Sequence, residues 1–282
     1  MSEELHPRAD ELDELSPYEL VALMHAEDHN AVSAIAPELE RISEAVEAIA
    51  DRIRAGGRLH YFGAGTSGLI AAMDASECPA TFGVDPDLVQ AHTADEPDEE
   101  DDRGLGQSAA SAARVSPRDA AVGISASGRT AFVIGALEEA TARRALTVAV
   151  TCNRLSRMGR GVDIAIEVET GPEVIAGSTR LKSGTVQKLV LNMLSTGVFT
   201  RLAHTHRGRM VGVVASNQKL RARAARVVAD LAGVSTGDAE RVLTEAGGSA
   251  KLAIVMLRHD VSAAEARDRL EASRGDLKAV LR

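Results

Sequence analysis

The chain of 282 residues carries 41 Asp and Glu against 32 Lys and Arg, which gives a formal net charge of −9 at pH 7. This balance argues against nucleic acid as the main partner, because binding to a phosphate backbone requires a basic surface. The two cysteines, Cys78 and Cys152, provide no disulfide framework, and the N-terminus lacks the layout of a signal peptide. No apolar run approaches the roughly 18 residues that span a membrane. We therefore expect a cytoplasmic protein without a membrane partner.

Two helices are expected before the first strand. The order Ser-Pro-x-Glu at Ser16–Glu19 matches a capping box, which predicts a helix that runs to about Glu27. Apolar residues at helical spacing predict a second helix over residues 37–55, which a pair of glycines would end. Residues 1–57 are therefore expected to form an N-terminal helical arm.

From Arg58 onward short apolar strands alternate with helices, which is typical of βαβ units and a parallel sheet. The expected strands are 59–62, 88–91, 120–124, 146–151 and 164–168. The expected helices between and after them are 68–76, 104–114, 130–143 and 185–202. We expect this α/β domain to cover residues 58–217. Several short, capped helices then predict a C-terminal helical module over residues 218–282.

A glycine-rich turn follows the first of these strands, at Gly63–Gly68. Backbone N–H groups and a helix N-terminus point at the same place in such a turn, so Gly65, Thr66 and Ser67 are candidates to bind an anionic ligand. The turn also matches the dinucleotide fingerprint GxGxxG. The acidic residue that would bind a ribose is missing from the end of the next strand, which disfavours a nicotinamide enzyme.

A second turn of the same design follows the strand at 120–124. Its hydroxyl and amide groups could satisfy a phosphate at a helix N-terminus, and the candidates are Ser125, Ser127, Gly128, Arg129 and Thr130. Two such turns at neighbouring strand ends predict a small phosphorylated ligand. The alternative is an ordinary capped turn.

The segment at 177–184 opens the long apolar helix with hydroxyls and two cations. Ser178 and Lys182 are therefore candidates for a third wall of the same pocket, and the alternative is a helix cap with solvated charges. His204 and His206 have no Cys or carboxylate at ligand spacing, so we expect no metal site there.

Two acidic segments could supply groups for proton transfer. Glu77 lies at the expected end of a helix among Ala, Cys and Pro, where lost hydration would suit proton transfer near neutral pH. A surface helix end is the alternative. The acidic run at 95–102 is more typical of a solvated loop, although the helix after it could place one of its members in the pocket.

Five longer segments carry a resemblance to a known family. They are GAGTSG, DASECPATFG, GISASGRT, GPEVIAGSTRLKSGT and QKLVLNMLSTG. Together they resemble the N-acetylmuramic acid 6-phosphate etherase family of sugar isomerase (SIS) domain proteins, from about Leu12 to the C-terminus. The resemblance implies an α/β, SIS-type three-layer sandwich with a five-stranded parallel sheet, a homodimer, and a small C-terminal helical (UBA-like) bundle.

The resemblance also implies a lyase of carbohydrate metabolism. Such an enzyme cleaves the lactyl ether of N-acetylmuramic acid 6-phosphate to N-acetylglucosamine 6-phosphate and D-lactate during peptidoglycan recycling, without a cofactor or metal. It places the proton donor on Glu77 and a second glutamate on Glu100, with another acid of the run as the alternative to Glu100. The phosphate would lie on Ser125, Ser127 and Thr130. The other residues expected to bind the phosphorylated amino sugar are Gly65, Thr66, Ser67, Gly128, Arg129, Glu173, Ser178 and Lys182.

The sequence departs from the family pattern at four places, one of which is the segment between Ala91 and Glu100, which is shorter than the family's and lacks its paired glycines. Leu69 stands where the family has arginine, Ala80 stands where it has proline, and Gly208–Gly212 lacks the family's Asn and Asp. Two alternatives therefore stay open, a phosphosugar-binding regulator without turnover and a SIS-fold phosphosugar isomerase. Release of D-lactate would separate the etherase from both.

Overall fold

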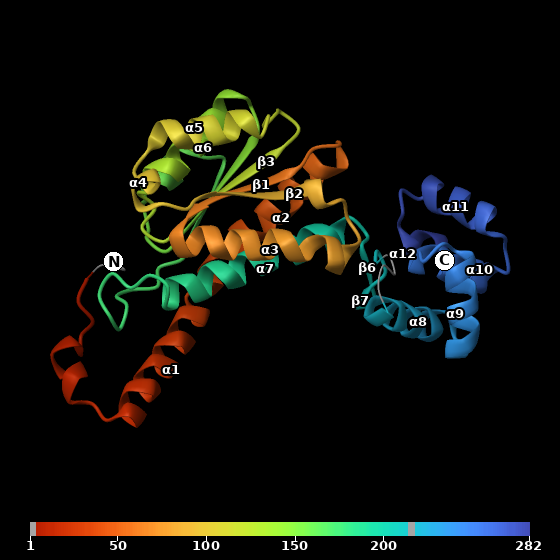
Figure 1. Ribbon diagram of the computed structural model, residues 1–282, viewed down its shortest axis with the longest axis horizontal. Helices are drawn as coiled ribbons and strands as arrows, with labels where there is room; N and C mark the ends of the chain where they lie inside the picture. The colour runs from red at the N-terminus through yellow and green to blue at the C-terminus, as the bar shows by residue number, and fades with distance from the viewer. Residues whose placement is uncertain (1–3, 214–217) are drawn as a thin grey trace. The chain divides into compact units, whose positions relative to one another are not determined.

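The computed structural model describes residues 4–213 and 218–282, which form two compact units (Figure 1). The first unit comprises Met1–Ser76 and Asp87–Gly197, and the second comprises Glu77–Pro86 and Val198–Arg282. The domain boundary expected after residue 217 falls at the end of residues 214–217, which lie outside the described residues. The domain limits therefore stay a prediction.

Two helices precede the sheet. In α1 (Pro17–Ser33) the capping box is present, because the side chain of Ser16 accepts the N–H of Glu19 while the Glu19 carboxylate accepts the N–H of Ser16. The helix runs past its expected end at Glu27. The second helix, α2 (Leu39–Arg54), lies where apolar spacing predicted it and packs its buried face against the sheet.

The first unit is built on a five-stranded sheet in which every pairing is parallel, as predicted. Its strands in chain order are β1 (Leu59–Ala64), β2 (Val89–Ala94), β3 (Ala120–Ser125), β4 (Leu146–Thr151) and β5 (Ile164–Glu167). The order across the sheet is β2-β1-β3-β4-β5. Every residue of β1, β3 and β4 is buried, as expected for strands covered on both faces.

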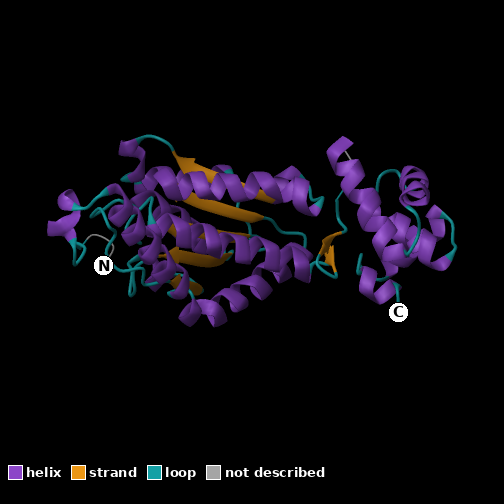
Figure 2. Cartoon of the chain, turned by 90° about the horizontal axis from the view of Figure 1, so that it is seen from below, coloured by secondary structure: helices purple, strands orange, loops and turns teal. Residues whose placement is uncertain are grey.

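Helices cover both faces of this sheet and complete three layers (Figures 1 and 2). On one face lie α5 (Arg103–Ala112) and α6 (Ala131–Ala142); on the other lie α2, α3 (Gly65–Phe82) and α7 (Lys182–Arg201). Close packing of α5 on α6 requires glycine, because a Cβ on Gly106 would lie 1.9 Å from the carbonyl oxygen of Phe132. This contact fixes the N-terminal half of α6 over the sheet.

Two expectations about local structure were wrong. The helix expected over 68–76 extends over the whole of α3, because the glycine-rich turn forms its first turn and Pro79 does not end it. Gly83, with φ of +67°, follows its last turn. The acidic run contains a short helix, α4 (Pro97–Glu100), which begins with a capping box formed by Glu96 and Glu99.

The second unit contains the predicted C-terminal helical module. Its helices are α8 (Gln218–Ala232), α9 (Thr236–Glu245), α10 (Ala250–His259), α11 (Ala263–Ala272) and α12 (Leu277–Val280), and a short antiparallel pair, β6 (Thr205–His206) with β7 (Arg209–Met210), precedes them. Val228, Val242 and Ile254 belong to its apolar core. Within the described ranges, no helix is long and apolar enough to cross a membrane.

Candidate active site

The strand order reverses between β1 and β3, which makes that point of the sheet the natural place for a ligand. Connections from these two neighbouring strands leave in opposite directions, so a crevice opens outside their carboxyl ends. Gly63 of β1 pairs with Ile124 of β3, which places the two ends side by side. Both turns singled out in the sequence therefore lie at this switch point.

The first turn brings backbone very close to backbone. A Cβ on Gly63 would lie 2.8 Å from the backbone nitrogen of Gly68, and Gly65 has a φ of +52°. Thr66 and Ser67 consequently occupy the first turn of α3, where N–H groups have no partner inside the helix. The Ser67 hydroxyl is buried and donates to the side-chain oxygen of Gln187 at 3.0 Å.

The second turn forms a cradle of hydroxyl and amide groups, which we call the Ser125–Thr130 cradle. Ser125 Oγ accepts the N–H of Gly128 at 3.1 Å and lies 2.8 Å from Thr130 Oγ1. Ser127 Oγ accepts the N–H of Arg129 at 3.2 Å, while the Arg129 side chain is exposed. Thr130 is the N-cap residue of α6 but its side chain does not cap the helix, so the first N–H groups of α6 are available to an anion.

Glu100 reaches this cradle. Its Oε1 accepts the hydroxyl hydrogen of Thr130 at 3.0 Å. Its neighbours in the acidic run are engaged elsewhere, because Glu99 accepts two backbone N–H groups at the start of α4 and Asp102 accepts the N–H of Leu105 at the start of α5. Among these three acids, Glu100 is the one that contacts the cradle.

The start of α7 is held by a buried carboxylate. Glu173 is 0% exposed, and its two oxygens accept the backbone N–H groups of Lys182 and Ser183, each at 2.9 Å. The ammonium group of Lys182 is buried and forms an ion pair with Glu27 of α1. Burial alone would raise the pKa of Glu27, but the hydrogen bond and charge of Lys182 outweigh it and hold that pKa below its usual value. Ser178 lies half-buried in the loop before the helix.

Gln187 and Ser183 were missed in the sequence. Both are buried on α7, and within the described part of the chain the Gln187 Nε2 and Ser183 Oγ atoms have no hydrogen-bond partner. A Cβ on Gly184 would lie 3.6 Å from the Thr66 methyl group, so this end of α7 adjoins the first turn. The available signal was a pair of polar residues four positions apart in a mostly apolar helix, which places both on one face.

Glu77 differs from the expectation in two respects. It lies inside α3 rather than at its end, and its side chain is exposed rather than held among apolar groups. At 1.5 Å per residue, Glu77 lies about 18 Å along the helix from Gly65. The same helix exposes Leu69 (72%) and Met73 (41%). Glu77 therefore belongs to an exposed, partly apolar face of α3.

Neither cysteine is placed to act as a nucleophile. Cys78 is buried in α3, and the Cys152 thiol, buried just after β4, donates to the carbonyl of Ser183 at 3.7 Å. Burial raises the pKa of Cys152 to about 12, so this thiol stays protonated and unreactive at neutral pH.

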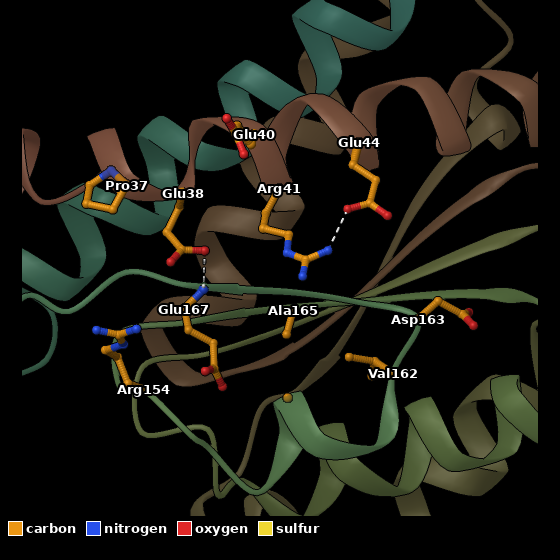
Figure 3. A pocket seen from close by; sticks show the side chains of 11 residues that line it. Pro37, Glu38, Glu40, Arg41, Glu44, Arg154, Val162, Asp163, Ala165 and Glu167 are labelled. Carbon is orange, nitrogen blue, oxygen red and sulfur yellow. Dashed lines mark hydrogen bonds and ion pairs between the residues drawn. The ribbon is translucent and has the colours of Figure 1, made fainter.

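A cavity of about 750 Å³ lies at the β5 edge of the sheet and contains none of the expected site residues (Figure 3). Here the Glu38 carboxylate accepts the N–H of Glu167 at 3.2 Å, which pairs a backbone group of the edge strand. Arg41 is occupied by an ion pair with Glu44. The polar groups of this cavity therefore serve to cover the β5 edge of the sheet.

Comparison with known proteins gives a consistent result. The family model described as "SIS domain" matches residues 26–152. An N-acetylmuramic acid 6-phosphate etherase of Streptomyces avermitilis is 44% identical, over 99% of this chain and 93% of that protein. Proteins of the same name from Mycolicibacterium smegmatis (45% identical, 97% and 95% covered) and Symbiobacterium thermophilum (49%, 88% and 85%) are also similar.

Solved structures share the fold. A protein of Escherichia coli CFT073, solved in complex with a ligand, has a TM-score of 0.52 at 18% identity, over 69% of this chain and 97% of that chain. A phosphoheptose isomerase from Neisseria gonorrhoeae has a TM-score of 0.50 at 21% identity, over 66% of this chain and 100% of that chain. At these sequence identities, the similarity supports the α/β sandwich fold alone.

Proposed function

This chain belongs to the N-acetylmuramic acid 6-phosphate etherase family, and from that membership we propose how its residues divide the work of the reaction. The enzyme is a lyase that converts N-acetylmuramic acid 6-phosphate and water to N-acetylglucosamine 6-phosphate and D-lactate. The observation that carries the assignment of residues is the 3.0 Å contact between the Glu100 carboxylate and Thr130 of the cradle. That contact joins a candidate proton-transfer group to a candidate phosphate site.

The phosphate of the substrate binds in the Ser125–Thr130 cradle in this proposal. The uncapped start of α6 presents N–H groups, and its helix dipole favours an anion there. Thr66 and Ser67 contribute the first turn of α3 from the neighbouring strand end. Ser67 has given its hydrogen to Gln187, so it can only accept, and a sugar hydroxyl or amide N–H suits it better than a phosphate oxygen.

The chemistry needs two proton transfers. With the sugar ring open, the aldehyde at carbon 1 acidifies the hydrogen on carbon 2, and Glu100 removes that proton as the base. The bond between carbon 3 and the lactyl oxygen breaks, the new carbon–carbon double bond forms, and Glu77 gives a proton to the departing lactate. Water then adds to the double bond at carbon 3 and carbon 2 regains a hydrogen. The aldehyde supplies the electron sink, so two carboxyl groups suffice.

Glu77 acts, we propose, in the cradle of a second copy of the chain. About 18 Å of helix separates it from the first turn of its own α3, which is longer than a sugar phosphate. Large apolar side chains are exposed beside it at Leu69 and Met73, and also on α1 at Tyr18 and Val21. Covering these side chains favours a two-fold homodimer, in which each chain completes the site of the other.

The remaining candidates support the site from the side of α7. Glu173 and Lys182 fix the first turn of that helix, and Ser178 lies in the loop that leads to it. A charged sugar phosphate does not cross a bilayer unaided, which agrees with a cytoplasmic enzyme.

The test of the function is D-lactate release from N-acetylmuramic acid 6-phosphate by the purified protein. We expect wild type to release lactate and Glu77→Gln and Glu100→Gln to lose at least about a hundredfold in kcat, the usual scale for a proton-transfer group. Asp98→Asn is the matched control, because Asp98 is an exposed acid on the same short helix as Glu100.

Two outcomes would contradict the proposal. Saturable binding of the sugar phosphate without any lactate would indicate a phosphosugar-binding regulator. Conversion of a phosphosugar aldose to its ketose without lactate would indicate an isomerase on the same fold.

A further inference from the structure

The cradle and Glu100 are joined by a continuous chain of hydrogen bonds. Glu100 Oε1 lies 3.0 Å from Thr130 Oγ1, which lies 2.8 Å from Ser125 Oγ, which accepts the N–H of Gly128 at 3.1 Å. Ser125 and Thr130 are both buried, at 2% and 8% exposure. Each hydroxyl has a single hydrogen to donate, so the direction of the chain can be deduced atom by atom.

In the ionised state of Glu100 the hydrogens all point toward the carboxylate. An ionised carboxylate only accepts, so Thr130 gives its one hydrogen to Glu100. Thr130 then has none left for Ser125, and Ser125 must be the donor in the short bond between the two hydroxyls. The contact from Ser125 to Ser127 Oγ is longer, at 3.4 Å. Neither buried hydroxyl can therefore donate to an anion while Glu100 stays ionised.

A phosphate in the cradle places the opposite demand on the same atoms. Phosphate oxygens accept hydrogen bonds, and the Ser125 hydroxyl can serve them only if it no longer donates to Thr130. If both contacts of Thr130 are kept, it must then donate to Ser125, and this requires that Glu100 holds a proton and donates it to Thr130. We propose that Ser125 and Thr130 form a two-way hydroxyl relay, through which phosphate in the cradle increases the proton affinity of Glu100.

The relay rests on the proposed function and gives it a further property. Glu100 becomes a stronger base once the substrate phosphate is bound. The proton that it takes from carbon 2 allows the hydrogen bonds of Thr130 and Ser125 to reverse, and Ser125 can then donate to the phosphate. The reversed chain then runs from Glu100 through Thr130 and Ser125 to the phosphate. The net change is one proton gained by the carboxylate, while each hydroxyl keeps one hydrogen and turns it to a different acceptor.

The charged groups near Glu100 lie on several elements. The direct contact of Glu100 with the cradle is its hydrogen bond with Thr130. On its own helix the neighbours are Asp98 and Glu99, and Glu99 is occupied by backbone N–H groups. On the side of α6, Arg129 precedes Thr130 with an exposed side chain, and further along that helix Glu138 pairs with Arg103. On β2, which also packs against α4, the titratable side chain is His92, whose ring hydrogen-bonds to His60.

Calorimetry with N-acetylglucosamine 6-phosphate measures the coupling directly. This ligand carries the phosphate but has no lactyl ether, so it binds without lactate release. The heat of binding at pH 6, in buffers of different ionisation enthalpy, gives the number of protons taken up. We expect wild type to take up more protons than Glu100→Gln, by a difference approaching about one per site. The titration of the ligand's own phosphate is common to both proteins and cancels.

Two variants at Thr130 separate a relay from a merely structural hydroxyl. Thr130→Val keeps the shape but removes the hydroxyl, so it should show the low uptake of Glu100→Gln, and Thr130→Ser should restore the wild-type value. Asp98→Asn should match wild type. Equal uptake in wild type, Thr130→Val and Glu100→Gln would overturn the relay. It would leave the etherase function standing, which D-lactate release tests on its own.

The kinetics give a second readout if Thr130→Val fails to fold. The acidic limb of kcat/KM reports the free enzyme and that of kcat reports the substrate complex. We expect the limb of kcat to lie at higher pH in wild type and in Thr130→Ser. Coincident limbs in wild type would contradict the relay. Absence of any binding heat would contradict both the relay and the proposed phosphate site.

Discussion

The buried carboxylate of Glu173 accepts the backbone N–H of Lys182 at 2.9 Å and, through its other oxygen, the N–H of Ser183. These bonds satisfy two of the donors that the first turn of a helix leaves unpaired. They also attach the end of α7 that adjoins the first glycine turn. Glu173 thus links the loop after β5 to the candidate active site.

Glu173→Gln should destabilise the protein and disturb the site together. The amide can accept one of the two N–H groups, but its own NH₂ then faces the other, so a buried donor loses its partner at a cost of about 1–3 kcal/mol. Urea unfolding should show the loss, and kcat should fall in protein that is still folded. The exposed neighbour Glu169→Gln should change neither quantity. Wild-type stability in Glu173→Gln would contradict this role.

The ion pair between Lys182 and Glu27 attaches α1 to the same turn of α7. Lys182→Met should cost about 3 kcal/mol of unfolding free energy, because it leaves the largely buried Glu27 carboxylate without its cation. The double variant Glu27→Gln with Lys182→Met should recover part of that loss. Urea unfolding of the two single variants and the double variant measures the coupling. Strictly additive losses would show that the pair contributes nothing.

The strands and the two turns could be predicted because their signals are local. Short, mostly apolar runs give β1, β3 and β4 close to their observed ends. The first turn of α3 was misassigned, because its glycines have low helix propensity, yet α3 begins at Gly65. At its other end α3 continues past residue 76, where it was expected to end, and through Pro79.

The site residues show the same division between local and long-range signals. The hydroxyls of the Ser125–Thr130 cradle are visible in one motif, whereas the pairing of Ser67 with Gln187 joins residues 120 positions apart. Lost hydration was expected at Glu77 because Ala, Cys and Pro lie near it in the sequence, with a surface helix end as the alternative. On a helix the next residue lies about 100° around the axis, so Cys78 is buried while Glu77 faces solvent.

A buried histidine should make the stability depend on pH. Burial, followed by the charges of His92 and Arg58, lowers the pKa of His60 to about 4. In the unfolded chain the ring binds a proton below about pH 6.5, whereas the folded chain does not until about pH 4. The unfolded state therefore binds more protons in this window, and stability falls as the pH is lowered from about 6.5, by up to about 1.4 kcal/mol per pH unit from this group.

Urea unfolding of His60→Phe between pH 7.5 and 4.5 checks this effect. The variant keeps an aromatic ring next to Phe62 but has no group to titrate, so its stability should fall less steeply than that of wild type. The exposed His29→Gln should keep the wild-type slope. Equal slopes in wild type and His60→Phe would show that His60 does not contribute.

Mixing two inactive variants tests whether Glu77 serves the cradle of the partner chain. In a dimer of Glu77→Gln with Glu100→Gln, one of the two sites combines both substitutions and the other combines two native carboxylates. Random pairing makes half of the dimers mixed, so the co-expressed pair should recover about a quarter of wild-type D-lactate release. If Glu77 acts within its own chain, every site contains a substitution and no activity returns.

The matched control for this experiment is a pair of variants in the same cradle. Glu100→Gln and Thr130→Val change groups that lie 3.0 Å apart in one chain, so every cradle in a mixed dimer carries one of the two substitutions. Pairing the chains cannot create a native cradle, although each chain still offers a native Glu77 to its partner. The co-expressed pair should therefore release D-lactate at no more than the mean rate of the two separate variants. A higher rate would show that mixing itself raises activity, and it would remove the support that complementation gives to a shared site.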